Sequence, residues 1–132
     1  MIWKRVSLSI AAALLVSAAA FGQQERLANS TPEQRAKLQT EFMTKRLGLG
    51  ATQIPKIEAI NLKYAKKMEP ILKGGEGPLV KLRASKAIEE DKGSELEKVL
   101  SKEQYQQYLA SREEMRQKVE EHLLEKHEGG GN

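Results

Sequence analysis

Cysteine is absent from the 132-residue chain, which excludes both disulfides and cysteine nucleophiles. Only two histidines occur, and a single aspartate, Asp91, accompanies the glutamates. Those glutamates recur in helical patterns, which suit a solvated face better than a paired catalytic acid and base. A phosphate-binding loop is also missing, because the glycines of residues 73–78 follow a helical segment instead of a strand. We therefore expect a protein that is not an enzyme and that uses no cofactor.

Signals for β-strands are weak as well. β-branched residues are few, and no stretch alternates apolar and polar residues over a useful length. Without disulfides to compensate for a thin core, the stability of a small domain must come from helix packing. The sequence thus predicts an all-α fold.

The first 22 residues have the three-part layout of a cleaved secretory signal peptide. A basic pair, Lys4 and Arg5, precedes an apolar run over residues 6–21, and small residues up to Gly22 offer cleavage positions. This run is short for a membrane span of roughly 20 apolar residues, which favours the signal peptide over a single membrane anchor. With no cysteine to carry a lipid, we expect a soluble periplasmic protein after cleavage.

Cleavage would weaken the basic character of the chain. The formal net charge of the whole sequence is +4, and the loss of Lys4 and Arg5 leaves +2. A nucleic-acid-binding protein normally keeps a strongly basic surface, so we expect no nucleic-acid partner.

Helix signals divide the remaining chain into a polar segment (23–30), a helical region (31–127) and a flexible glycine-rich tail (128–132). We expect four helices that run antiparallel in a thin hairpin layer. Their expected positions are about 32–47, a second helix through 57–71, then 79–100 and 102–126. Pro70 should bend or end the second helix, and Gly93 should kink or fray the third.

Apolar periodicity indicates which side of the last two helices faces inward. On the third helix, the expected inward residues are Leu82, Ile88, Leu96 and Val99. The fourth helix carries a seam like that of a heptad repeat. Its members are Tyr105, Tyr108, Arg112, Met115, Val119 and His122 or Leu123.

A short motif recurs at the expected helix starts. Ser101 and Gln104 have the spacing of a capping box, in which the hydroxyl accepts from one backbone amide while the glutamine side chain returns to another. Leu100 precedes the cap at the position of a hydrophobic staple. A second copy runs from Leu49 to Gln53 with Gly50 at the cap position, and a third, without the leucine, opens the first helix.

This repeated L-T/S-x-x-Q element, on a small helical chain behind a signal peptide, resembles the Spy/CpxP family of periplasmic proteins, whose hallmark is a pair of LTxxQ motifs. The matching residues are Leu100, Ser101, Gln104, Leu49 and Gln53. The resemblance implies a thin, cradle-like four-helix fold, usually dimeric. It also implies ATP-independent chaperone activity or regulation of a stress sensor in the periplasm.

Charge is distributed unevenly along the chain. Residues 31–92 carry thirteen basic and eight acidic residues, whereas residues 93–132 carry six basic and nine acidic ones. One interpretation is that antiparallel helices have complementary surfaces, within one chain or across a dimer. The other is a basic patch that attracts acidic segments of unfolded clients. The sequence leaves both open.

Apolar residues of the first two helices allow a similar choice. Residues at helical spacing are usually core, but a thin layer cannot cover both of its faces, and an exposed apolar patch rimmed by lysines would bind clients. The candidate client-binding residues are Phe42, Met43, Ile54, Tyr64, Lys66, Lys67 and Met68.

The two histidines, His122 and His127, are the only candidate metal ligands of note. They lie five residues apart, a spacing that does not place them on one helix face as a four-residue spacing would. We therefore expect two solvated or partly packed histidines and no metal site.

Three hypotheses follow for the function. The leading one is a chaperone that binds unfolded or partly folded proteins. The second is a regulatory module that binds the sensor domain of an envelope-stress kinase. The third is a structural homodimer that forms through the seam of the fourth helix.

Overall fold

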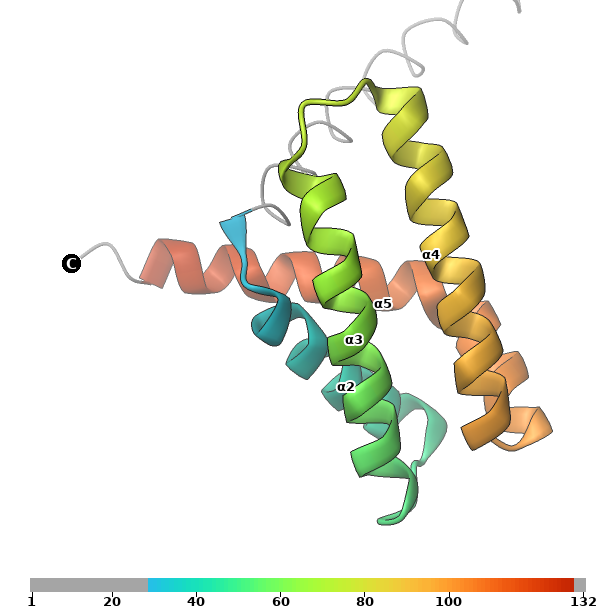
Figure 1. The fold of residues 1–132 in the computed structure, drawn as a ribbon. Helices are drawn as coiled ribbons and strands as arrows, with labels where there is room; N and C mark the ends of the chain where they lie inside the picture. The colour runs from blue at the N-terminus through green and yellow to red at the C-terminus, as the bar shows by residue number, and fades with distance from the viewer. Residues whose placement is uncertain (1–28, 130–132) are drawn as a thin grey trace, which may run out of the picture.

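The computed structural model describes residues 29–129, with side chains up to residue 125. Four helices make up this range (Figure 1). They are α2 (Pro32–Leu47), α3 (Gln53–Lys73), α4 (Pro78–Val99) and α5 (Lys102–Gly129). No strand occurs among the described residues, so the prediction of a four-helix, all-α fold is confirmed. The expected signal peptide lies outside the described residues.

Helix α2 begins and ends where the sequence predicts. The backbone N–H of Gln34 donates to Thr31 Oγ1 at 3.1 Å, and the backbone N–H of Thr31 donates to Gln34 Oε1 at 2.9 Å. These two bonds form a complete capping box. The helix ends at Gly48, whose φ of 63° lies in the left-handed region that glycine tolerates best.

Neither Pro70 nor Gly93 ends its helix. Helix α3 continues through Pro70 and ends three residues later, at Lys73. Pro70 has no N–H to donate to the carbonyl of Lys66, so one intrahelical bond is lost, but only three residues of the helix follow it. Helix α4 runs without a break through Gly93, which is buried. The preference of glycine for other conformations, about 1 kcal/mol relative to alanine, is outweighed by the packing of α4 on α3.

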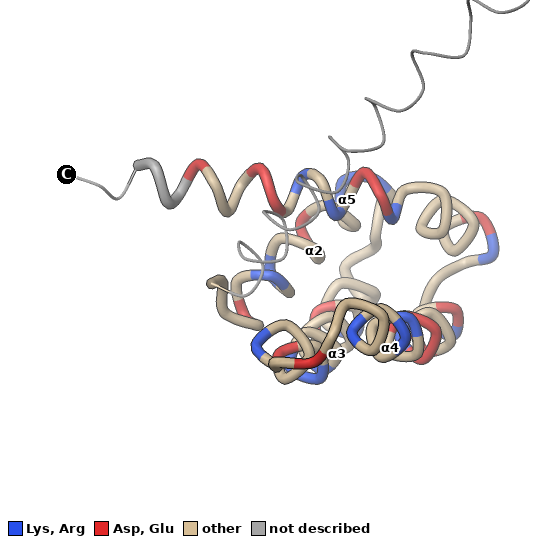
Figure 2. The backbone as a smooth tube through the Cα atoms, turned by 90° about the horizontal axis from the view of Figure 1, so that it is seen from above, with Lys and Arg blue, Asp and Glu red and all other residues tan. Residues whose placement is uncertain are grey.

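The helices form two layers around an interior space. Helices α2 and α3, and likewise α3 and α4, are antiparallel neighbours, while α5 runs back across them (Figure 1). Seen from above, α3 and α4 lie side by side, and α5 lies on the opposite side with α2 (Figure 2). Helices α2 and α5 pack on each other, whereas α4 and α5 make few contacts. A cavity therefore remains between the layers.

The core is contributed by all four helices. Its most deeply buried apolar side chains are Met43, Ile57, Leu96 and Tyr108. Two further seam residues of α5, Met115 and Val119, are buried in the same cluster. The α5 seam thus packs mainly within its own chain, although Arg112 and His122 are exposed.

The expected inward position of Leu82 is wrong, because its side chain is 64% exposed. Leu82 lies fourteen residues before Leu96 and therefore on the same face of α4, but it belongs to the first turns of the helix, where residues 78–80 are exposed as well. Helix α5 continues to Gly129, three residues beyond the predicted limit at residue 126.

Within residues 29–129, no helix is both long enough and apolar enough to cross a membrane.

Candidate functional site

The repeated motif forms two linked helix starts. At α5, the backbone N–H of Gln104 donates to Ser101 Oγ at 3.1 Å, and the backbone N–H of Ser101 donates to Gln104 Oε1 at 2.9 Å. At α3, the backbone N–H of Gly50 donates to Gln53 Oε1 at 2.9 Å, so this copy keeps the half of the box that needs no hydroxyl. The side chains of Gln53 and Gln104 also bond to each other.

The leucines of the motif, Leu49 and Leu100, are both buried in the core cluster. The predicted motif residues therefore lie together and have a structural role. They join the turn between α2 and α3 to the turn between α4 and α5.

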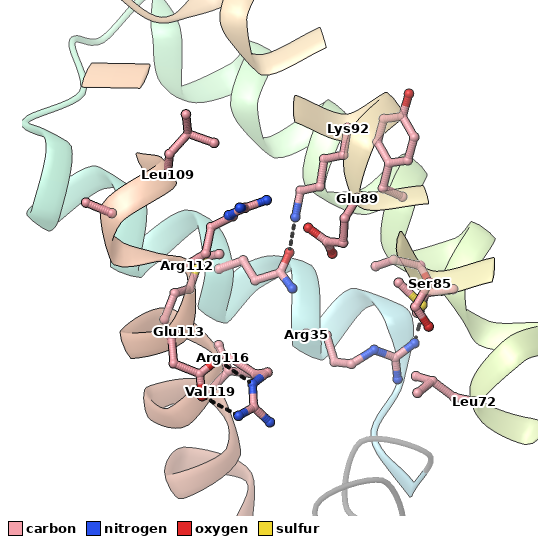
Figure 3. Close-up of a pocket in the computed structure, with 16 residues that line it drawn as sticks. Arg35, Leu72, Ser85, Glu89, Lys92, Leu109, Arg112, Glu113, Arg116 and Val119 are labelled. Atoms are coloured by element: carbon pink, nitrogen blue, oxygen red, sulfur yellow. Dashed lines mark hydrogen bonds and ion pairs between the residues drawn. The ribbon is translucent and has the colours of Figure 1, made fainter. Parts of the chain in front are cut away.

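A cavity of about 600 Å³ lies between the two layers and is lined by side chains from all four helices (Figure 3). Its volume falls in the range of roughly 300–1,000 Å³ that is typical of small-molecule sites. Much of its wall is apolar. The apolar side chains include Ala65, Met68, Leu72, Leu109, Ala110, Met115 and Val119.

Two arginines of the cavity wall are held by carboxylates. Arg35 is buried and donates to Glu69, to the Ala65 carbonyl at 3.4 Å and to the Ser30 carbonyl at 2.7 Å. Arg116 pairs with the carboxylates of neighbouring residues on α5. Burial alone would raise the pKa of Glu69, but hydrogen bonds from Lys73 and Arg35 outweigh it and hold this pKa below its usual value.

The remaining charges of the cavity are Glu89 and Lys92 on α4 and Arg112 on α5. Lys92 is only 2% exposed, and its ammonium group donates to the amide oxygen of Gln39 at 2.9 Å. Burial lowers the pKa of Lys92, although the nearby carboxylate of Glu89 opposes this effect. Among the described residues, neither Glu89 nor Arg112 forms an ion pair.

A second feature lies in the first turns of α4. Three large apolar side chains are exposed there: Leu79 at 58%, Val80 at 51% and Leu82 at 64%. Arg83 and Lys86 are exposed on the same side of the helix as Leu79 and Leu82, and Val80 lies on the adjoining side. We call these five residues the outer α4 patch. The sequence offered one signal for this patch. Leu79 and Val80 are consecutive, and two consecutive residues of a helix do not both belong to one inward stripe.

The candidate client-binding residues do not form one surface. Met43 is 1% exposed and belongs to the core, so it is not available to a client. Tyr64 is likewise buried, beneath the ammonium groups of Lys63 and Lys67, which lie 5.3 and 5.1 Å from its ring centroid. The interaction with Glu95, followed by burial, raises the pKa of Tyr64 to about 12.

The other candidates are scattered. Phe42 lines a shallow groove between α2 and α5, and Ile54 packs on the edge of the core. Met68 faces the cavity between the layers. Lys66 and Lys67 lie on α3 and are exposed, as the attraction of acidic client segments requires.

His122 is exposed and lines the same α2–α5 groove as Phe42. His127 lies in the last turns of α5, but its side chain is outside the described part of the structure. Among the described residues, no three histidine, aspartate or glutamate side chains gather as metal ligands would.

Comparison with known proteins yields one match. A family model described as "Domain of unknown function (DUF4890)" matches residues 19–108, a stretch that includes α2, α3 and α4 entirely and the first turns of α5. Neither the curated proteins nor the solved structures give a match. Because the matched stretch covers more than half of the chain, the protein belongs to the DUF4890 family.

Proposed function

We propose that the protein is an ATP-independent periplasmic chaperone of the Spy/CpxP type, which binds unfolded or partly folded proteins on the outer α4 patch. The observation that carries this proposal is the exposure of Leu79, Val80 and Leu82, each more than half exposed, on one short stretch of helix. Large apolar side chains that are exposed near one another are typical of interaction sites.

Charge around the patch suits the binding of unfolded chains. Arg83 and Lys86 lie within it, and Lys66 and Lys67 are exposed on the neighbouring helix α3. Cations beside an apolar surface attract acidic segments of a client and increase the rate of encounter, while the apolar side chains provide contact area. Such a surface selects for exposed apolar residues without requiring one particular sequence.

Two sequence features support the periplasmic part of the proposal. The layout of residues 1–22 is that of an export signal, and the paired motif copies resemble those of the Spy/CpxP family. N-terminal sequencing of the protein recovered from a periplasmic extract tests export, with cleavage expected near Gly22.

Suppression of aggregation tests the chaperone activity. The purified mature protein is mixed at low salt with a client that aggregates on dilution from denaturant, and light scattering is followed. We expect stoichiometric suppression by the wild type and a large loss of suppression in the double variant Leu79→Ser/Leu82→Ser. Both positions are exposed, so helicity by circular dichroism should be unchanged.

The double variant Glu103→Ser/Gln106→Ser is the matched control, because it places two serines at the same spacing on an exposed face of α5. It should suppress aggregation as the wild type does. The absence of suppression by the wild type, or equal activity of both double variants, would contradict the proposal. A pull-down that returns one stoichiometric partner in place of many clients would favour the regulatory alternative.

A further inference from the structure

Two cations of the cavity between the layers form no ion pair with a described residue. Arg35 and Arg116 are bound by carboxylates, which leaves two cations, Lys92 and Arg112, against one carboxylate, Glu89. All three side chains line the cavity, and Figure 3 shows Lys92 and Glu89 extending from α4 and Arg112 from α5. Lys92 and Arg112 are therefore the cations of the cavity wall that are available to an anionic ligand.

Of these two cations, Lys92 is in the more unusual environment. Its side chain is almost fully buried, yet its hydrogen-bond partner among the described residues is the neutral amide of Gln39. A buried ammonium group has three donors and loses much of its hydration, so it normally requires an anion nearby. Methionine would fill the same space without this cost, and a polar group kept in such a position is a candidate for ligand binding.

The rest of the wall suits an apolar molecule. Met68 and Leu72 from α3 and Met115 and Val119 from α5 line the same cavity. Methionine side chains adapt readily to the shape of a flexible chain. The site thus combines cations at Lys92 and Arg112 with an apolar surface large enough for a small molecule.

We propose that this cavity binds a small molecule that has one carboxylate and an apolar chain, such as a medium-chain fatty acid. The carboxylate accepts hydrogen bonds from Lys92 and Arg112, and the chain packs along Met68, Leu72 and Val119. Glu89 limits the negative charge that the site accepts, so a monocarboxylate fits better than a dicarboxylate or a phosphate. This inference is independent of client binding on the outer α4 patch.

Calorimetric titration of the purified protein with decanoate, below its critical micelle concentration, tests the inference. We expect one decanoate bound per chain, and binding of 1-decanol and decylamine about tenfold weaker or less, because a charged hydrogen bond contributes about that factor. Arg112→Gln should weaken decanoate binding about tenfold with little change in stability, since Arg112 is exposed to solvent. Glu89→Gln should tighten decanoate binding, because it removes a negative charge of the cavity wall.

Two controls separate the cavity from other sites. Lys98→Gln removes an exposed cation of α4 that does not line the cavity and should leave the affinity unchanged. Leu79→Ser/Leu82→Ser tests whether decanoate only adheres to the outer α4 patch, and it should also leave the affinity unchanged. No measurable binding, equal binding of decanoate and decanol, an unaltered affinity in Arg112→Gln, or loss of binding in the patch variant would each overturn the inference.

Discussion

The side-chain amides of Gln53 and Gln104 form a reciprocal pair. Gln53 Nε2 donates to Gln104 Oε1 at 2.7 Å, and Gln104 Nε2 donates to Gln53 Oε1 at 3.1 Å. Gln53 also donates to the carbonyl of Val99 at the end of α4, and Gln104 to the carbonyl of Leu47 at the end of α2. Each glutamine therefore caps the start of one helix and donates to the last carbonyl of another. The pair connects two turns that are distant in sequence.

Gln104→Ala should be strongly destabilising. It removes the return bond to the backbone of Ser101 and leaves both the Leu47 carbonyl and the Gln53 amide without this partner. Part-buried polar groups that lose a hydrogen bond cost about 1–3 kcal/mol each, so we expect a loss of about 2–3 kcal/mol in the free energy of unfolding after partial solvation. Urea denaturation measures it.

Gln107→Ala is the control, because Gln107 is exposed on the same helix and should change stability by no more than about 0.5 kcal/mol. In a double-mutant cycle, Gln53→Ala and Gln104→Ala should show a coupling of about 1 kcal/mol. Additive changes in the free energy of unfolding would show that the two side chains do not interact.

Gly93→Ala should stabilise the protein. An added Cβ would meet the hydroxyl of Tyr105 at 3.6 Å, an ordinary contact distance, and Gly93 lies within the continuous helix α4. The expected gain is about 0.4–1 kcal/mol, mainly from lower entropy of the unfolded chain. Gly48→Ala, with φ at 63°, should instead cost about 1–2 kcal/mol. Similar shifts of melting temperature in both variants would contradict the described backbone.

Stability should depend on pH through Lys92. Burial lowers the pKa of Lys92 in the folded protein below its ordinary value of 10.5. Between those two pKa values the unfolded chain binds more protons than the folded one, so the free energy of unfolding rises with pH across that window. Lys92→Met should remove this rise and be no less stable than the wild type at pH 7.

Urea denaturation at pH 7 and pH 9.5 measures the difference between the two proteins. Lys98→Met, at an exposed site of the same helix, should retain the wild-type pH dependence. If the free energy of unfolding of Lys92→Met still rises between pH 7 and pH 9.5 as it does in the wild type, another group causes the rise.

Glu69→Gln should weaken the contact between α2 and α3. It removes the carboxylate that binds Arg35, a buried cation, and that Lys73 also contacts at 2.8 Å. Because the pKa of Glu69 is lowered on folding, its contribution is present above the ordinary value of 4.5 and is lost as pH falls through the lower folded value. We expect Glu69→Gln to lower the free energy of unfolding by about 2 kcal/mol at pH 7. Below pH 4.5, the free energy of unfolding of the variant should depend less on pH than that of the wild type.

Lys66→Glu/Lys67→Glu should slow the association of an acidic client without altering helicity. Both side chains are exposed, so their effect is long-range attraction and not packing. The difference from the wild type should shrink as ionic strength rises, because salt screens exposed charges. Stopped-flow association rates at low and high salt measure it, and a difference independent of salt would contradict the electrostatic explanation.

Local signals predicted the helices well. The limits of α2 follow from Thr31, Gln34 and Gly48, which act within a few residues of one another. The pairing of Gln53 with Gln104 was not foreseen, because no local rule connects residues so distant in sequence. Gly93 was expected to interrupt α4, but packing between helices outweighed its intrinsic preference.

The candidate sites were harder to predict than the helices. Periodicity identified apolar stripes but not how much of each stripe the neighbouring helices cover, so Leu82 was placed inside and Met43 among surface candidates. The burial of Arg35 and Lys92 had no signal in the sequence, where both read as ordinary surface cations. Their position depends on how α2, α3, α4 and α5 enclose the cavity.

The central claim is that unfolded chains bind on the outer α4 patch, and a nuclear magnetic resonance titration tests it most directly. The ¹⁵N-labelled mature protein is titrated with a permanently unfolded, non-aggregating client. We predict that shifts and line broadening concentrate at residues 79–87 and disappear in Leu79→Ser/Leu82→Ser. No change at stoichiometric client, or changes confined to the α2–α5 groove around Phe42, would contradict the claim.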